Sequence, residues 1–157
     1  MIRTELFSSG SNALYAALKN LGLENDSIIA IPDYYCDSAI NRLKHKYKIL
    51  VYKIDNNLLP NTKSLKELLN TNVAAVVLVQ YFNTIIDLEE QIREVKKSKS
   101  LVIIDAIHLY SKSSDSIYKD SDATIYSIKK PLLLNEGAIT YVRNRLLTTS
   151  IQISSIS

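Results

Sequence analysis

SLVIIDAI, at residues 100–107, is a run of aliphatic residues that a single carboxylate, Asp105, interrupts near its end. A second run, VAAVVLVQ at residues 73–80, carries no polar side chain before its last position. Apolar runs that do not alternate with polar residues are typical of parallel strands whose two faces are both buried. The two segments therefore predict strands of a sheet that is covered on both sides.

Shorter strands alternate with helical patterns along the rest of the chain. Further strands are predicted at SIIAIP (27–32), ILVYKID (49–55), DATIYSI (122–128) and GAITYVR (137–143). Helices are predicted after the loop 8–12, from about Asp37, and from two sequences with the form of a capping box, Ser64-Leu65-Lys66-Glu67 and Asp87-Leu88-Glu89-Glu90. This alternation predicts a three-layer α/β domain, a mostly parallel sheet with helices on both faces. No linker or repeat divides the chain, so we expect one domain over residues 1–157, with a disordered tail at 144–157.

The composition of the 157-residue chain is that of an ordinary globular protein, with 46% hydrophobic and 22% charged residues. Cys36 is the single cysteine, so no disulfide can form within the chain, and a reducing, cytoplasmic location is expected. The net charge of +3 comes from lysines spread along the chain, which does not favour a nucleic-acid partner. No apolar run is long enough for a membrane span, and two histidines with one cysteine favour no metal site.

In parallel sheets, ligands bind outside the carboxyl ends of the strands, and three polar segments are expected there. The first is the loop from Ser8 to Asn12, which precedes a helix and so offers free backbone N–H groups to an anion. The alternative is ordinary helix capping, a common use of serine and asparagine.

The second segment is the end of the strand at 100–107, where Asp105 is followed by His108. A buried carboxylate must meet a cation, a hydrogen-bond donor or solvent. Asp105 is therefore either a cap for the next turn or an acid held ready for a cationic ring. His108 is either a satisfied histidine of the partial core or a catalytic residue.

The third segment is the lysine pair Lys129–Lys130 before Pro131. Proline favours an extended conformation for the residue that precedes it, so Lys130 cannot continue a helix. A desolvated lysine in such a place can bond covalently to a carbonyl ligand, whereas a solvated one is simply part of a turn.

Five segments in a fixed order give the sequence a resemblance to a known family. They are SSGSNALYAALKNLG (8–22), IIAIPDYYCDSAI (28–40), VVLVQYF (76–82), LVIIDAIHLY (101–110) and DATIYSIKKPLLLNEGAITYV (122–142). From about Leu6 to Arg143 the chain resembles the large domain of the DegT/DnrJ/EryC1/StrS family, the sugar aminotransferases that depend on pyridoxal 5′-phosphate (PLP). The resemblance implies the type I fold of PLP-dependent transferases.

The resemblance also implies roles for individual residues. The cofactor phosphate would be held by Ser9, Gly10, Ser11, Asn12 and Ser127. Tyr34 or Tyr35, with Cys36 as a third candidate, would stack on the pyridine ring. Asp105 would pair with the ring nitrogen, and His108 would contact the region of the ring hydroxyl. Lys130, or Lys129 if the register differs by one, would bond covalently to the cofactor.

The family further implies an amino-group transfer from an amino acid such as glutamate to a keto-sugar nucleotide, in surface-polysaccharide or related sugar biosynthesis. Its members are dimers whose sites the neighbouring subunit completes, and they carry a smaller C-terminal domain. We expect that domain to be absent here, and we expect exposed apolar surface in its place. Asn83 and the run Asn135-Glu136-Gly137 depart from the more usual glycines of the family.

Three interpretations stay open at the level of sequence. The chain is the cofactor-binding part of a sugar aminotransferase, a truncated homologue that has lost catalysis, or a non-enzymatic α/β binding domain. Retention of Asp105, Lys130 and the serine loop favours the first.

Overall fold

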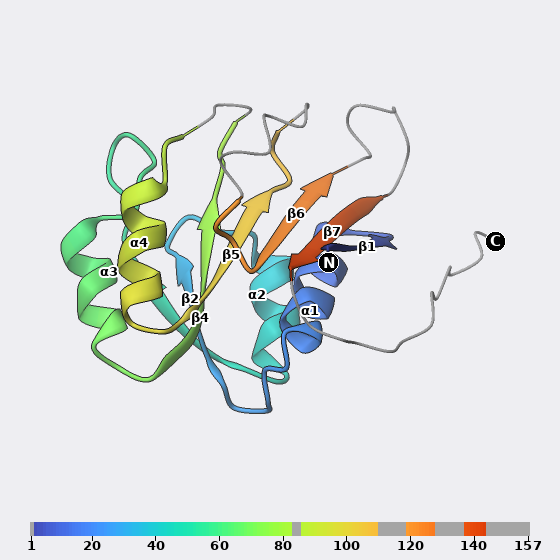
Figure 1. The fold of residues 1–157 in the computed structure, drawn as a ribbon, viewed down its shortest axis with the longest axis horizontal. Helices are drawn as coiled ribbons and strands as arrows, with labels where there is room; N and C mark the ends of the chain where they lie inside the picture. Colours follow the sequence, from blue (N-terminus) through green and yellow to red (C-terminus); the bar gives the residue numbers. More distant parts are fainter. Residues whose placement is uncertain (1, 83–85, 110–118, 128–136, 144–157) are drawn as a thin grey trace.

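A central sheet organises the computed structural model, which describes residues 2–82, 86–109, 119–127 and 137–143 (Figure 1). In these ranges the sheet has seven strands in the order β1-β7-β6-β5-β4-β2-β3. The strands are β1 (Ile2–Phe7), β2 (Ile28–Pro32), β3 (Lys48–Tyr52), β4 (Val73–Val79), β5 (Leu101–Ala106), β6 (Ala123–Ser127) and β7 (Ala138–Arg143). The predicted strands at 27–32, 49–55, 73–80, 100–107, 122–128 and 137–143 are all present, each within a few residues of its expected bounds.

Most strand pairs are parallel, as the sequence predicts. The pairs β2–β3, β2–β4, β4–β5 and β5–β6 are parallel, and β7 runs antiparallel to both β6 and β1. The chain leaves β2 for β3 on one side and then returns to form β4 on the other side of β2. The carboxyl ends of β2 and β4 therefore flank a point where the direction of winding reverses, which is where open α/β sheets bind ligands.

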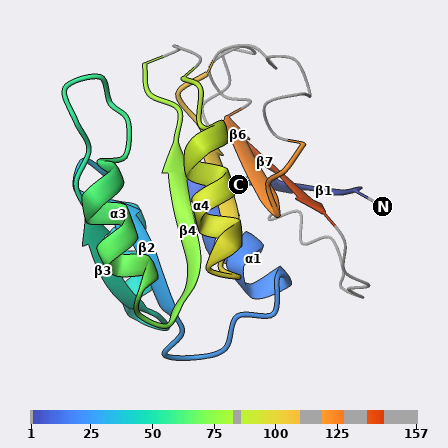
Figure 2. The same ribbon diagram turned by 60° about the vertical axis from the view of Figure 1, so that its left-hand side comes forward.

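Helices cover both faces of the sheet, so the three-layer prediction is confirmed. The helices are α1 (Gly10–Asn20), α2 (Asp37–Lys44), α3 (Thr62–Leu69) and α4 (Glu89–Lys97). Helix α1 contacts α2 and packs on β6 and β7, whereas α3 contacts α4, which packs on β5. The turned view separates the two layers, with α3 and α4 on one side of the strands and α1 on the other (Figure 2). None of the helices in the described ranges has the length and apolar character needed to cross a bilayer.

Both capping-box predictions are wrong in detail. Helix α3 begins earlier than expected, because the side chain of Asn61 accepts a hydrogen bond from Ser64 N at 3.0 Å and so caps the helix. The Ser64 hydroxyl is used elsewhere and accepts from Lys53 N at 3.0 Å. At α4 the cap position is Leu88, which has no side-chain cap bond, and Asp87 Oδ1 accepts from Glu89 N at 2.9 Å.

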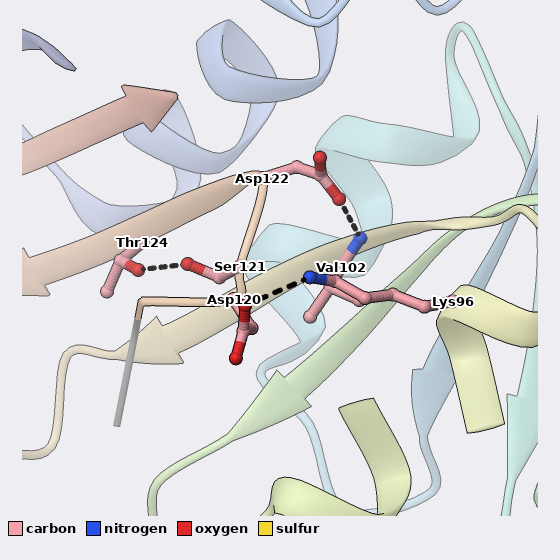
Figure 3. Close-up of polar contacts among 6 residues, drawn as sticks. All are labelled: Lys96, Val102, Asp120, Ser121, Asp122 and Thr124. Atoms are coloured by element: carbon pink, nitrogen blue, oxygen red, sulfur yellow. Dashed lines mark hydrogen bonds and ion pairs between the residues drawn. The ribbon is translucent and has the colours of Figure 1, made fainter. Parts of the chain in front are cut away.

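The register of β5 against β6 is held at the amino ends of the two strands (Figure 3). Asp122 Oδ2 accepts from Val102 N at 2.8 Å, and Asp122 N donates to Val102 O at 2.8 Å. Next to them the buried hydroxyls of Ser121 and Thr124 lie 2.8 Å apart. In this register Asp105 lies opposite Ile125. Contacts at the amino ends of the two strands thus help to set the position of the acid at the carboxyl end of β5.

Candidate functional site

Three neighbouring strands end at the same edge of the sheet and are followed by polar and aromatic residues. Residues 33–36 follow β2, residues 80–82 follow β4, and His108 follows β5 closely. Because β2, β4 and β5 are adjacent and parallel, these segments converge outside the carboxyl ends of the strands. Asp105 and His108, two of the residues expected at this edge, lie at the end of β5 and directly after it.

Asp105 is the buried acid at the centre of this edge, and the residue is only 4% exposed. Its Oδ2 accepts a hydrogen bond from the Tyr35 hydroxyl at 2.6 Å, and its Oδ1 accepts from Ile107 N at 3.1 Å. Burial, and then the charge of Asp105, hold the pKa of the Tyr35 phenol well above its ordinary value. Tyr35 therefore remains protonated and donates, which supplies the donor that a buried carboxylate requires.

Four rings form an aromatic cluster beside Asp105: Tyr34, Tyr81, Phe82 and His108. The ring centroids of Tyr34 and Tyr81 are 5.7 Å apart, and His108 meets Phe82 edge-on at 5.8 Å. The Tyr81 hydroxyl donates to Tyr34 O at 2.6 Å, which ties the end of β4 to the end of β2. Tyr34 and Phe82 are 54% and 56% exposed, so two rings of this cluster are accessible to solvent at the carboxyl edge of the sheet.

Tyr81 and Phe82 were not among the residues that the sequence singled out as a site. A signal was present, because they follow directly on the buried strand β4, and strand ends supply site residues in this class of sheet. Phe82 also has a φ of 50°, in the left-handed region that non-glycine residues seldom adopt. Strained backbone of this kind concentrates at functional sites.

The three stacking candidates occupy different environments. Tyr35 is half-buried and bonded to Asp105, whereas Tyr34 belongs to the aromatic cluster. Cys36 is exposed at the cap of α2, with its Sγ 3.0 Å from Ser38 Oγ. The hydrogen bond with Ser38 lowers the pKa of the Cys36 thiol.

The serine loop forms the amino end of α1. Ser9 is the cap, and its hydroxyl accepts from Asn12 N at 3.2 Å. Asn12 Nδ2 donates to Ser8 Oγ at 2.8 Å, and Ser11 Oγ lies 3.3 Å from Ser38 Oγ in the first turn of α2. The loop thus caps its helix, as the alternative interpretation expects, and also joins the first turns of α1 and α2.

Gly10 brings the amino end of α1 against the loop that follows Asp105. A Cβ at Gly10 would overlap Ile107 Cδ1 and would lie 3.1 Å from Ile107 Cγ1. Any other residue at position 10 would force Ile107 or the helix to move, so glycine is needed here because it lacks a Cβ. The predicted phosphate loop and the predicted ring-nitrogen acid are therefore neighbours.

Of the remaining predicted site residues, the structure describes Ser127 but not Lys129 or Lys130. Ser127 is the last residue of β6, is buried and pairs with Ala138 of β7. Lys129 and Lys130 lie outside the described residues, as do the departures at residues 83 and 135–136 and the tail at 144–157.

The mostly parallel sheet between two helical layers is the fold of the large domain of type I PLP-dependent aminotransferases. The sequence pattern of the DegT/DnrJ/EryC1/StrS aminotransferase family matches residues 6–144, and the chain belongs to that family. The family is PLP-dependent.

Solved structures with the same fold are distant in sequence. The aminotransferase TlmJ from Streptoalloteichus hindustanus superposes with a TM-score of 0.77 at 16% identity, over 90% of this chain and 40% of that one. Helicobacter pylori PseC, an aminotransferase involved in the biosynthesis of pseudoaminic acid, gives 0.76 at 18% identity, over 90% and 40%. NtdA from Bacillus subtilis, solved with bound cofactor PMP, gives 0.73 at 17% identity, over 91% and 33%.

The chain spans about 40% of the length of the first two of these structures. Among curated proteins, none matches the sequence.

Proposed function

We propose that this chain binds PLP at the carboxyl edge of its sheet and supplies the cofactor-binding part of a sugar aminotransferase. The observation that carries the proposal is the buried Asp105 at the end of β5, in contact through its following loop with the amino end of α1. A cationic ring nitrogen and a phosphate are the two ends of the cofactor, and these two neighbouring places suit them.

The residues present fit the cofactor chemically. A carboxylate that is only 4% exposed keeps a nearby ring nitrogen protonated, because little water competes for its charge. The capped amino end of α1 offers N–H groups and a positive dipole end to the phosphate, and the hydroxyls of Ser9 and Ser11 lie there. When bound, the cofactor acts as an electron sink for the carbon that gains or loses the amino group.

The aromatic cluster and its neighbour Tyr35 suit the face of a planar ring. Tyr34 and Tyr35 are the two aromatic candidates for stacking on the pyridine, with Cys36 as the third candidate. The ring of His108 contacts that of Phe82. We assign the proton transfers and the covalent bond to Lys130, by its position in the family pattern, with Ser127 as a further phosphate ligand.

The substrates proposed for the complete enzyme are an amino-acid donor and a keto-sugar nucleotide. The chain spans about 40% of comparable structures. By the family pattern, we propose that a second copy or a partner polypeptide contributes residues to the site. We propose a cytoplasmic homodimer, or an assembly with a partner polypeptide, as the active form, and a role in sugar biosynthesis.

The test is covalent labelling at the lysine. Purified chain is mixed with PLP, reduced with borohydride and digested, and the modified peptide is identified by mass spectrometry. We expect the adduct at Lys130 and its loss in Lys130→Ala, with Lys129→Ala as the matched control that keeps it. An adduct on Lys129 would move the register by one residue.

Absence of any adduct at saturating PLP would contradict the proposal. That result would favour the truncated homologue that keeps the fold without the chemistry.

A further inference from the structure

The buried acid of the site already has a side-chain partner. The Tyr35 hydroxyl donates to Asp105 Oδ2 at 2.6 Å, the short distance of a hydrogen bond to an ionised acceptor. A ring nitrogen that comes to pair with Asp105 therefore meets a carboxylate that already accepts a hydrogen bond from the Tyr35 phenol.

The two oxygens of Asp105 are held in different ways. Oδ1 accepts from the backbone of Ile107, in the turn that ends β5, and this contact belongs to the fold. Oδ2 accepts from the side chain of Tyr35, which stands between β2 and α2 and has its own rotatable bonds. Oδ2 is consequently the oxygen that an incoming donor can take over without moving the sheet.

The phenol is the protonated partner in this pair. Burial is the largest cause of its raised pKa, followed by the charge of Asp105, with smaller contributions from Tyr52 and Cys36. The Tyr35 hydroxyl is thus a neutral donor to a buried acceptor. A charged N–H donor makes a stronger hydrogen bond to a carboxylate than a neutral hydroxyl does.

We propose that Tyr35 is a placeholder, whose hydroxyl occupies Asp105 Oδ2 in the ligand-free chain and gives it up to the protonated ring nitrogen of an incoming pyridine. The proposal rests on the proposed function for the identity of the ligand. It adds a conformational step, because the chain is competent to bind only in the fraction of molecules in which Tyr35 has released the acid. Ligands that lack a charged ring nitrogen cannot replace the bond that they break.

The experiment compares Tyr35→Phe with the unchanged chain for binding of pyridoxamine 5′-phosphate. This probe has no aldehyde, so its binding does not depend on a covalent bond to lysine. Tyr35→Phe keeps the ring and removes only the hydroxyl. Tyr47→Phe is the matched control, because Tyr47 is 3% exposed and lies outside the site, and its buried hydroxyl has no hydrogen-bond partner among the described residues.

Removal of a hydrogen bond to a charged group from the ligand-free state alone should strengthen binding about tenfold or more. We therefore expect a dissociation constant at least about tenfold lower for Tyr35→Phe and no change for Tyr47→Phe. Equal or weaker binding by Tyr35→Phe, with the unchanged chain still binding, would overturn the placeholder and leave the proposed function standing. Failure of both chains to bind would overturn the two together.

A second measurement covers a Tyr35→Phe chain that does not fold. 3-Fluorotyrosine is introduced at position 35 alone, and its single fluorine NMR signal is followed during addition of pyridoxamine 5′-phosphate. Release of the phenol should move the signal and lower the phenol pKa toward its ordinary value. A signal and a phenol pKa that saturating ligand leaves unchanged would overturn the placeholder.

Discussion

Gly10 and Ile107 lie against each other where the two halves of the proposed cofactor site meet. The phosphate end depends on the first turn of α1, and the ring end depends on the strand that carries Asp105, so a displacement at this contact separates the two. The contact is steric, since a Cβ at position 10 would overlap Ile107 Cδ1. Alanine is otherwise the better helix former, so a loss of stability on replacing Gly10 by alanine would report the steric contact.

Gly10→Ala should therefore destabilise the chain by about 1 kcal/mol, the lower end of the cost of overpacking, because the overlapping atom is the end of a flexible, partly exposed side chain. Ile107→Val removes the Cδ1 atom and should cost about 0.5–1.5 kcal/mol alone. In the double variant the two losses should be less than additive, because the clashing atom is gone. Urea denaturation of the four chains measures this coupling, and strict additivity would show that the contact does not constrain position 10.

Single residues show where sequence reasoning succeeds and where it fails. Asp105 could be identified because an acid in an apolar strand must find a donor, although nothing in the sequence indicated that the donor is Tyr35. Tyr81 and Phe82 were missed because aromatic residues after a buried strand look like more core. The roles of Ser127, Lys130 and the stacking tyrosine stay predictions.

At the level of elements, strands and helices with strong patterns were predictable and those that depend on distant partners were not. Strand β1 was missed because Ile2–Phe7 pairs only with β7, which lies at the opposite end of the described chain. Strand propensity is set largely by such partners. The predicted strand at 49–55 ends early for a similar reason, since Lys53 N and Ile54 N donate to the side chains of Ser64 and Asp33.

The start of α3 offers a direct test of the capping correction. Asn61→Ala should destabilise the chain by about 1 kcal/mol, because Ser64 N loses its cap acceptor. Glu67→Ala is the matched control, since a capping box would require Glu67 whereas the structure gives it an exposed position in the helix. Thermal unfolding of both variants decides the matter. A larger loss for Glu67→Ala than for Asn61→Ala would restore the capping box.

At the level of the whole molecule, the sheet is open at both sides in the described chain. Strands β1 and β3 are its two edges, and each carries an exposed large apolar residue, Leu6 at 61% and Val51 at 51% exposure. Edge strands with exposed apolar side chains are templates for association with another chain. Tyr34 and Phe82 of the aromatic cluster are the other exposed large hydrophobic residues in the described ranges. The wider exposed apolar surface expected from the sequence stays a prediction.

We expect the purified chain to associate as its concentration rises, with a mass by light scattering above the 17.7 kDa of one copy. A lysine on an edge strand opposes such pairing, because it would have to be desolvated between two chains. Leu6→Lys and Val51→Lys should therefore each lower the apparent mass, and the edge whose variant lowers it more is the dominant interface.

Asn56→Lys adds the same charge at an exposed loop position and should leave the association unchanged, which separates edge pairing from simple charge repulsion. A chain that stays at the mass of one copy across the whole concentration range would show that the open edges are already protected. Association that persists in a chain carrying both Leu6→Lys and Val51→Lys would point instead to the exposed rings of Tyr34 and Phe82 as the contact.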